Sequence, residues 1–171
     1  MRIEDVFSDD ITFYMTTVDQ ASVNDLGRQL GSSHDPKTDV RFIRGSKCKT
    51  VDGLFDEFAA AMQFPYYFGE NWNAFNDCMS DLSWLDCEAV VVVVYDADEL
   101  LKDANDGDVA IFFRIINEAR ARRTISLQSI DDVLKDMPLH LVLQVDDSQL
   151  ASMTNRLVTN SVAFGTLHVS S

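Results

Sequence analysis

Residues 64–82 read FPYYFGENWNAFNDCMSDL, and the rest of the chain is organised around this stretch. An aromatic turn lies between Pro65 and Gly69, and the residue spacing then predicts a short helix from about Glu70. One face of that helix is apolar and should enter a core; it carries Trp72, Phe75, Cys78, Met79 and Leu82. The opposite face is polar, with three carboxylates and no cation; it carries Glu70, Asn73, Asp77, Ser80 and Asp81.

The run PYYFGENWNAFNDC is similar to the segment that defines the barstar family of ribonuclease inhibitors. The matching residues are Pro65, Tyr67, Phe68, Gly69, Glu70, Asn71, Asp77 and Cys78. The resemblance extends over Val40–Val145 and is strongest in Phe64–Leu82. It implies a small parallel sheet flanked by helices. It also implies a protein that plugs the basic active site of a nuclease, with acidic groups in place of substrate phosphates.

The resemblance also implies roles for individual residues. Asp77 corresponds to the central acid of the family's motif helix, and Tyr67 to the aromatic residue that packs into the nuclease site. Gly69 and Asn71 correspond to the turn that allows close approach. Glu118, within INEARAR, corresponds to a second acid on a later helix. We therefore expect these five residues to contact a protein partner.

Two positions depart from the family's reference inhibitor. Asn73 stands where that inhibitor has an aspartate, and Asn76 where it has a tryptophan. Both lie on the expected partner surface, which thereby loses one formal charge and one apolar contact of the kind that often forms a hot spot. Trp72 does not replace that contact, because its helical phase places it in the core. We therefore do not expect tight inhibition of the reference ribonuclease. We expect a different cognate toxin.

Strand-like and helix-like segments alternate along the chain, which predicts an α/β fold. The expected strands are Ile11–Val18, Val40–Ile43, Ala89–Tyr95, Leu139–Val145 and Ser161–Val169. The other expected helices are Gln20–Leu30, Val51–Met62 with Thr50 as its cap, Val109–Arg122, Ser129–Lys135 and one from Asp147 or Ser148 to Leu157; a short turn is expected at Glu99–Lys102. Ala89–Tyr95 is apolar throughout, as is typical of a parallel strand covered on both faces.

The segments outside the barstar-like part are β/α additions at both ends of the chain. We expect residues 1–171 to form a single barstar-like domain with these two extensions, and either Ile11–Val18 or Ser161–Val169 to extend one edge of the sheet. No internal repeat and no linker marks a domain boundary.

The charge is strongly acidic, with 28 Asp and Glu against 14 Lys and Arg and a net charge of −14. Such a surface repels nucleic acid and attracts basic partners. Three cysteines without a CxxC spacing, Cys48, Cys78 and Cys87, indicate free thiols in a reducing compartment. The absence of a signal peptide and of an apolar run long enough to cross a membrane predicts a cytoplasmic protein with no membrane partner.

Enzyme motifs are absent from the sequence. His34, His140 and His168 do not have the spacing of metal ligands or of a nucleophile and its base, and no phosphate-binding glycine motif occurs. We therefore expect no catalysis, no cofactor and no metal. Three hypotheses follow, in this order: an inhibitor or immunity protein for a nuclease toxin, a barstar-like module for another basic protein, and an acidic enzyme of unknown type.

Overall fold

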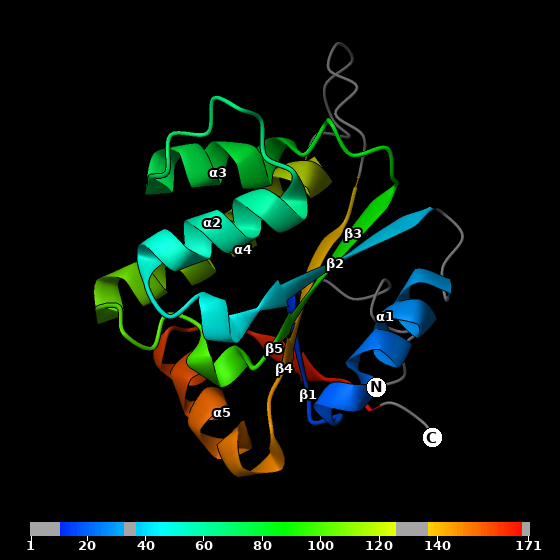
Figure 1. The fold of residues 1–171 in the computed structure, drawn as a ribbon, viewed down its shortest axis with the longest axis vertical. Coiled ribbons are helices and arrows are strands. Elements are labelled where there is room, and N and C mark those ends of the chain that lie inside the picture. The colour runs from blue at the N-terminus through cyan, green and yellow to red at the C-terminus, as the bar shows by residue number, and fades with distance from the viewer. Residues whose placement is uncertain (1–10, 33–36, 126–136, 169–171) are drawn as a thin grey trace.

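Five parallel strands form one sheet in the order β2-β3-β4-β1-β5, as the computed structural model shows for residues 11–32, 37–125 and 137–168 (Figure 1). The strands are β1 (Phe13–Thr16), β2 (Thr38–Arg44), β3 (Ala89–Tyr95), β4 (Leu139–Gln144) and β5 (Phe164–Thr166). β3 lies inside the sheet, paired with β2 and β4, and its residues 89–94 are fully buried. The expectation from its uninterrupted apolar sequence is confirmed.

Helices cover both faces of the sheet. They are α1 (Val23–Ser32), α2 (Val51–Met62), α3 (Trp72–Asp81), α4 (Asp106–Ile125) and α5 (Leu150–Thr159), with single 3₁₀ turns η2 (Gln20–Ser22), η3 (Gly45–Lys47), η4 (Ala97–Glu99) and η6 (Asp147–Gln149). α1 packs on one face, while α2, α3, α4 and α5 contribute to the core on the other. Figure 1 shows α2, α3 and α4 grouped together on that side. Within this group, α3 lies above α2 and α4 in the view of Figure 1.

The expected fold class, an α/β fold with a parallel sheet flanked by helices, is confirmed. Both end segments extend the sheet at one side, since β1 pairs with β4 and β5 pairs with β1. The last strand is shorter than the expected Ser161–Val169. α4 begins three residues earlier than expected, because Asn105 Oδ1 accepts a hydrogen bond from Asp108 N–H at 3.0 Å and so starts the helix. The helix expected at Ser129–Lys135 lies outside the described residues.

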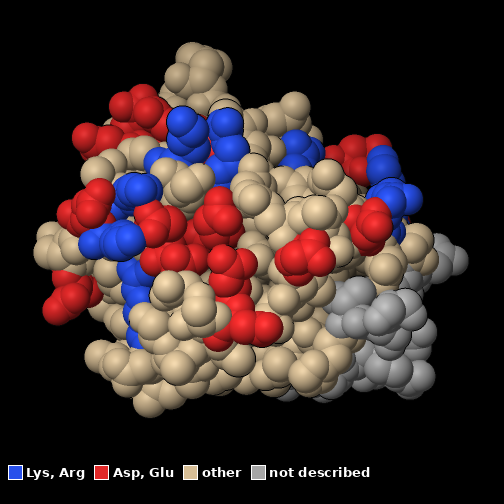
Figure 2. Space-filling model, turned by 60° about the horizontal axis from the view of Figure 1, so that its bottom comes forward, with Lys and Arg blue, Asp and Glu red and all other residues tan. Residues whose placement is uncertain are grey.

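The carboxyl ends of three strands are joined by one buried side chain. Gln144, at the end of β4, donates from Nε2 to the Val18 carbonyl at 2.9 Å and accepts at Oε1 from Asp96 N–H at 3.1 Å. The acidic residues that follow these strand ends are Asp19, Asp96, Asp98, Glu99, Asp146 and Asp147. Figure 2 shows acidic side chains gathered on this face of the molecule. Much of the negative charge therefore lies at the carboxyl ends of the strands, and α3 carries only part of it.

Candidate functional site

The helix of the motif, α3, has the two faces that its sequence predicts. Phe75, Cys78 and Met79 are buried, and Trp72 is half-buried against the core. On the other side, Asn73, Asp77 and Asp81 are exposed and Ser80 is half-buried. The apolar face anchors the helix, so its exposed face is held in a fixed orientation. A rigid helix face of this kind suits recognition of a protein partner.

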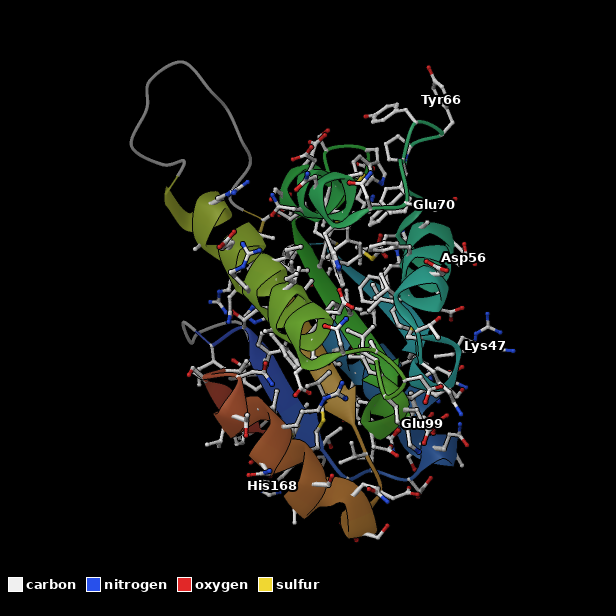
Figure 3. The ribbon with its side chains drawn as sticks, turned by 90° about the vertical axis from the view of Figure 1, so that its left-hand side faces the viewer. Lys47, Asp56, Tyr66, Glu70, Glu99 and His168 are labelled. Carbon is white, nitrogen blue, oxygen red and sulfur yellow. The ribbon has the colours of Figure 1, made fainter. Side chains whose placement is uncertain are left out.

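The aromatic turn before α3 exposes two tyrosines. Tyr66 and Tyr67 have relative exposures of 101% and 67%, and their rings meet edge to face at 5.6 Å. Phe68 turns the other way and packs on Phe55 and Phe64, with ring-centre distances of 5.8 and 4.9 Å. Phe68 therefore covers the entrance of the helix. Figure 3 shows Tyr66 projecting from the end of the molecule.

The start of α3 differs from its expected position. The helix begins at Trp72, not at Glu70, because Asn71 is its N-cap. Asn71 accepts at Oδ1 from Ala74 N–H at 3.0 Å and donates from Nδ2 to the Gly69 carbonyl at 2.9 Å. Glu70 therefore lies in the turn, with a left-handed backbone at φ 47°. Glu70 is exposed, so its charge still lies next to the polar face of the helix.

Gly69 keeps space free for this cap. A Cβ at Gly69 would lie 3.0 Å from Asn71 Nδ2, tighter than an ordinary contact. The backbone of Gly69 itself does not adopt a positive φ. The Gly-Glu-Asn sequence is therefore explained by the local structure: the glycine gives room to the asparagine amide, and the asparagine caps the helix.

Substituting Asn71→Ala should lower the free energy of unfolding by about 0.5–2 kcal/mol, because the cap of α3 is lost. Urea denaturation followed by circular dichroism measures this change. Asn73→Ala is the matched control, since Asn73 is exposed on the same helix and should change stability by less than about 0.5 kcal/mol. Equal effects of the two substitutions would show that the cap does not contribute.

Trp72 ties α3 to α4. Its Nε1–H donates to Asp108 Oδ1 at 2.9 Å, and its ring packs on Phe55 at 5.0 Å between ring centres. Asp108 lies in the first turn of α4. Trp72 is thus part of the packing, as its helical phase predicts.

Glu118 lies on α4 between two arginines. Arg114 donates to Glu118 Oε1 at 3.1 Å, and Arg122 Nη2 is 3.8 Å from Glu118 Oε2. Arg122 Nη1 also reaches Ser80 Oγ of α3 at 3.4 Å. The structure therefore brings α4 beside the polar face of α3, and it adds a cation that the sequence of residues 64–82 alone does not contain.

Of the seven residues singled out in the sequence, the structure places five together, while Asn76 is partly buried and Glu118 lies on α4. Tyr67, Gly69, Asn71, Asn73 and Asp77 follow one another on the turn and the exposed side of α3. Asn76 is half-buried, and its Oδ1 is buried without a hydrogen-bond partner in the described part of the chain. Sequence reasoning missed Tyr66 and Arg122; a third aromatic residue between Pro65 and Gly69 was the available signal for Tyr66.

The thiol at this site is not set up for chemistry. Burial raises the pKa of Cys78, and the neighbouring carboxylates of Asp77 and Asp81 raise it further. The thiol is therefore held protonated at neutral pH, and a protonated thiol is a poor nucleophile. Among the described residues, no three His, Cys, Asp or Glu side chains are grouped so that they could hold a metal ion. Within the same ranges, no helix is both long and apolar enough to cross a bilayer.

Two solved structures that are similar to this chain differ in how well they superpose on it. The Aeropyrum pernix ORC2 protein, in ADPNP-ADP complexes, matches with a TM-score of 0.57 at 8% identity, over 98% of this chain and 45% of that one. A chain in the structure of Drosophila ORC bound to AT-rich DNA and Cdc6 matches with a TM-score of 0.46 at 12% identity, over 96% of this chain and 49% of that one. This chain thus spans about half the length of these proteins. At such identity the Aeropyrum pernix match indicates a similar fold only.

A search of the curated proteins finds no match. The family comparison is informative: the model for Barstar (barnase inhibitor) matches residues 38–131, more than half of the chain. The matched part contains β2, α2, the aromatic turn, α3, β3 and all of α4. The exposed tyrosines, the capped helix and Asp77 all lie within it. On this match the chain belongs to the Barstar (barnase inhibitor) family.

Proposed function

We propose that this protein is an inhibitor, or immunity protein, that binds and blocks the active site of a nuclease toxin, specifically a ribonuclease. The observation that supports this best is the surface made by the Tyr66–Tyr67 pair and the exposed side of α3 within the family match. We refer to Tyr66, Tyr67, Glu70, Asn73, Asp77 and Asp81 as the motif surface. Tyr67, Gly69, Asn71, Asn73, Asn76, Asp77 and Glu118 remain the proposed partner-binding residues.

The mechanism is occupation of the phosphate sites. A nuclease cleft presents arginine, lysine and histidine side chains that bind substrate phosphates. A carboxylate such as Asp77 can accept charge-assisted hydrogen bonds from those groups, and these are the stronger class of hydrogen bond. Tyrosine suits the accompanying anchor, because it buries a large ring at a small cost in side-chain entropy. Glu118 contributes less charge than expected, since Arg114 and Arg122 lie against it.

A second candidate is a module that binds a basic protein other than a nuclease. Asn73 and Asn76 favour this candidate, because they replace a charge and an aromatic ring of the family's reference inhibitor. Both candidates share the motif surface and differ in the partner's activity.

We also propose that residues 1–171 act as one barstar-like domain with both extensions. The position of β1 between β4 and β5 supports this, since the N-terminal extension pairs directly with the strand that follows α4.

The test is a titration of RNA cleavage with purified protein. Barnase is one enzyme to use, and the product of the adjacent reading frame, tested for nuclease activity, is the candidate cognate enzyme. Cleavage by the cognate enzyme should stop at a 1:1 molar ratio, and barnase should be inhibited weakly. A stable complex with a basic protein that cuts no nucleic acid would favour the second candidate. Failure to inhibit either enzyme, with no complex formed, would contradict the proposed function.

Association should be strongly salt-dependent. Because the net charge is −14, a basic partner is attracted over long distances, and screening removes this attraction as the Debye length falls to about 8 Å. Stopped-flow measurement of the association rate should therefore show a steep decrease with ionic strength, whereas the dissociation rate should change little. An association rate that is indifferent to salt would argue against a charged docking surface.

Substituting Asn73→Asp should strengthen binding to barnase. The new carboxylate would lie one helical turn before Asp77, where the reference inhibitor has an acid. The free energy of unfolding should decrease by only about 0.2–0.5 kcal/mol, because like charges at i, i+4 repel. The control is Asn24→Asp, which adds the same charge on the exposed part of α1. If wild-type protein already binds barnase tightly, the interpretation of Asn73 is wrong.

A further inference from the structure

A cavity of about 570 Å³ lies between α5 and the segment that joins η4 to α4. It is remote from the motif surface: Figure 3 shows Glu99, which lines the cavity, well separated from Tyr66 along the length of the molecule. Its volume falls within the range of about 300–1,000 Å³ that is typical of small-ligand sites. No step of the proposed inhibition uses it.

Arg156 of α5 is the unusual group in this cavity. Its guanidinium is half-buried and, within residues 11–32, 37–125 and 137–168, forms no hydrogen bond or ion pair. The other arginines whose side chains the structure describes, at positions 28, 41, 44, 114, 120 and 122, all have a polar partner. In a chain with twice as many acids as bases, an arginine that lines a cavity and forms no ion pair leaves its N–H donors available to an anionic ligand.

The acids of the cavity leave Arg156 available. Glu99 is occupied, because Lys102 and Lys49 bind it at 2.6 and 2.7 Å and lower its pKa to about 2. Asp98 and Asp106 line the cavity and form no ion pair in the described part of the chain. Burial lowers the pKa of Arg156 and the nearby charge of Asp106 acts in the opposite direction, yet the two side chains do not form an ion pair.

The remaining lining supplies an apolar floor and polar sides. Leu101, Val109 and Met153 lie beneath it with at most 6% exposed, and the half-buried Ala104 adds apolar surface that a ligand can reach. A guanidinium binds a carboxylate through two parallel hydrogen bonds, and two free aspartates favour an ammonium group. A phosphate dianion fits less well, because Asp98 and Asp106 would repel it. A simple cation would leave Arg156 without a partner.

We propose that this cavity binds an α-amino acid with an apolar side chain. Its carboxylate lies on Arg156, its ammonium group faces Asp98 and Asp106, and its side chain lies against Ala104, above the buried Leu101, Val109 and Met153. This proposal is independent of nuclease inhibition.

The test is an NMR titration of the full chain with L-leucine, following the Arg156 Nε–H signal and the backbone amides of α5. Leucine should cause saturable shifts with a dissociation constant on the order of 1 mM or lower. L-Leucinamide lacks the carboxylate and 4-methylpentanoate lacks the ammonium group; each should bind about tenfold to a hundredfold more weakly. Arg156→Gln should weaken leucine binding by a similar factor.

Arg28→Gln is the matched control, because Arg28 is exposed on α1 and pairs only with Asp25 among the described residues. It should leave leucine binding unchanged. Thermal melts establish that both variants fold. No saturable shift with leucine, or equal shifts in wild type and in folded Arg156→Gln, would overturn the proposal. Equal binding of leucine and leucinamide would overturn the carboxylate assignment on which it rests.

Discussion

Substituting Asp77→Ala should weaken partner binding by about 2–5 kcal/mol, a loss of roughly thirtyfold to several thousandfold in affinity. Asp77 is exposed on α3, so in the proposed complex its carboxylate becomes buried against basic groups of the partner. Removing it leaves those groups buried without their counter-charge. Stability should hardly change, since alanine is a better helix former than aspartate and one of many negative charges is lost.

Titration calorimetry with the cognate partner measures the affinity of wild type and of Asp77→Ala. Thermal melts of the same two proteins measure their stability. Asp56→Ala is the matched control: it removes the same charge from an exposed position on α2, labelled in Figure 3. Its affinity should stay close to that of wild type. An unchanged affinity in Asp77→Ala would remove this residue from the interface. A large decrease in melting temperature would instead show that it is structural.

Substituting Phe75→Ala should act on stability, which Asp77→Ala leaves unchanged. We expect a loss of about 3–5 kcal/mol in the free energy of unfolding. Phe75 is fully buried and lies two residues before Asp77 on the same helix. Its ring contacts Phe58 of α2 and Phe112 of α4, with ring centres 5.3 and 6.3 Å away. Alanine would leave a cavity where three helices meet. Urea denaturation measures the loss, which is a large part of the roughly 5–15 kcal/mol that stabilises a typical domain.

The control for Phe75→Ala is Tyr66→Ala, which removes an aromatic ring from the same stretch at a fully exposed position. Its stability should lie within about 0.5 kcal/mol of wild type. A similar loss in both variants would mean that aromatic content matters more than burial. A negligible loss in Phe75→Ala would contradict the packing of α3 described above.

Periodic segments could be predicted well from sequence. α2 begins after Thr50 and ends at Met62 as expected, because its cap and its apolar stripe agree. Ala89–Tyr95 forms β3 with the expected bounds, since an uninterrupted run of β-branched residues has few alternatives. The faces of α3 also followed from periodicity, which depends on spacing and not on the first residue of the helix.

Features that depend on distant segments could not be predicted. Nothing near Glu118 indicates that α4 would place Arg122 against Ser80, because that contact requires the packing of two helices. The left-handed backbone of Glu70 could not be predicted either, because the neighbouring Gly69 is the residue normally expected in that conformation. The cavity around Arg156 joins η4, α4 and α5, and no local pattern brings these together.

The position of β1 in the sheet has a consequence for how the chain folds. β2, β3 and β4 are neighbours in the order in which they are synthesised, whereas β1 is made before all three and pairs with β4 and β5. Its ladder begins with Phe13 opposite Leu141, so the chain between residues 13 and 141 forms the loop that this pairing closes. Loop closure over such a length is entropically costly, and non-local pairing of this kind slows folding. On the ribosome, β1 therefore stays without its strand partners until β4 has emerged.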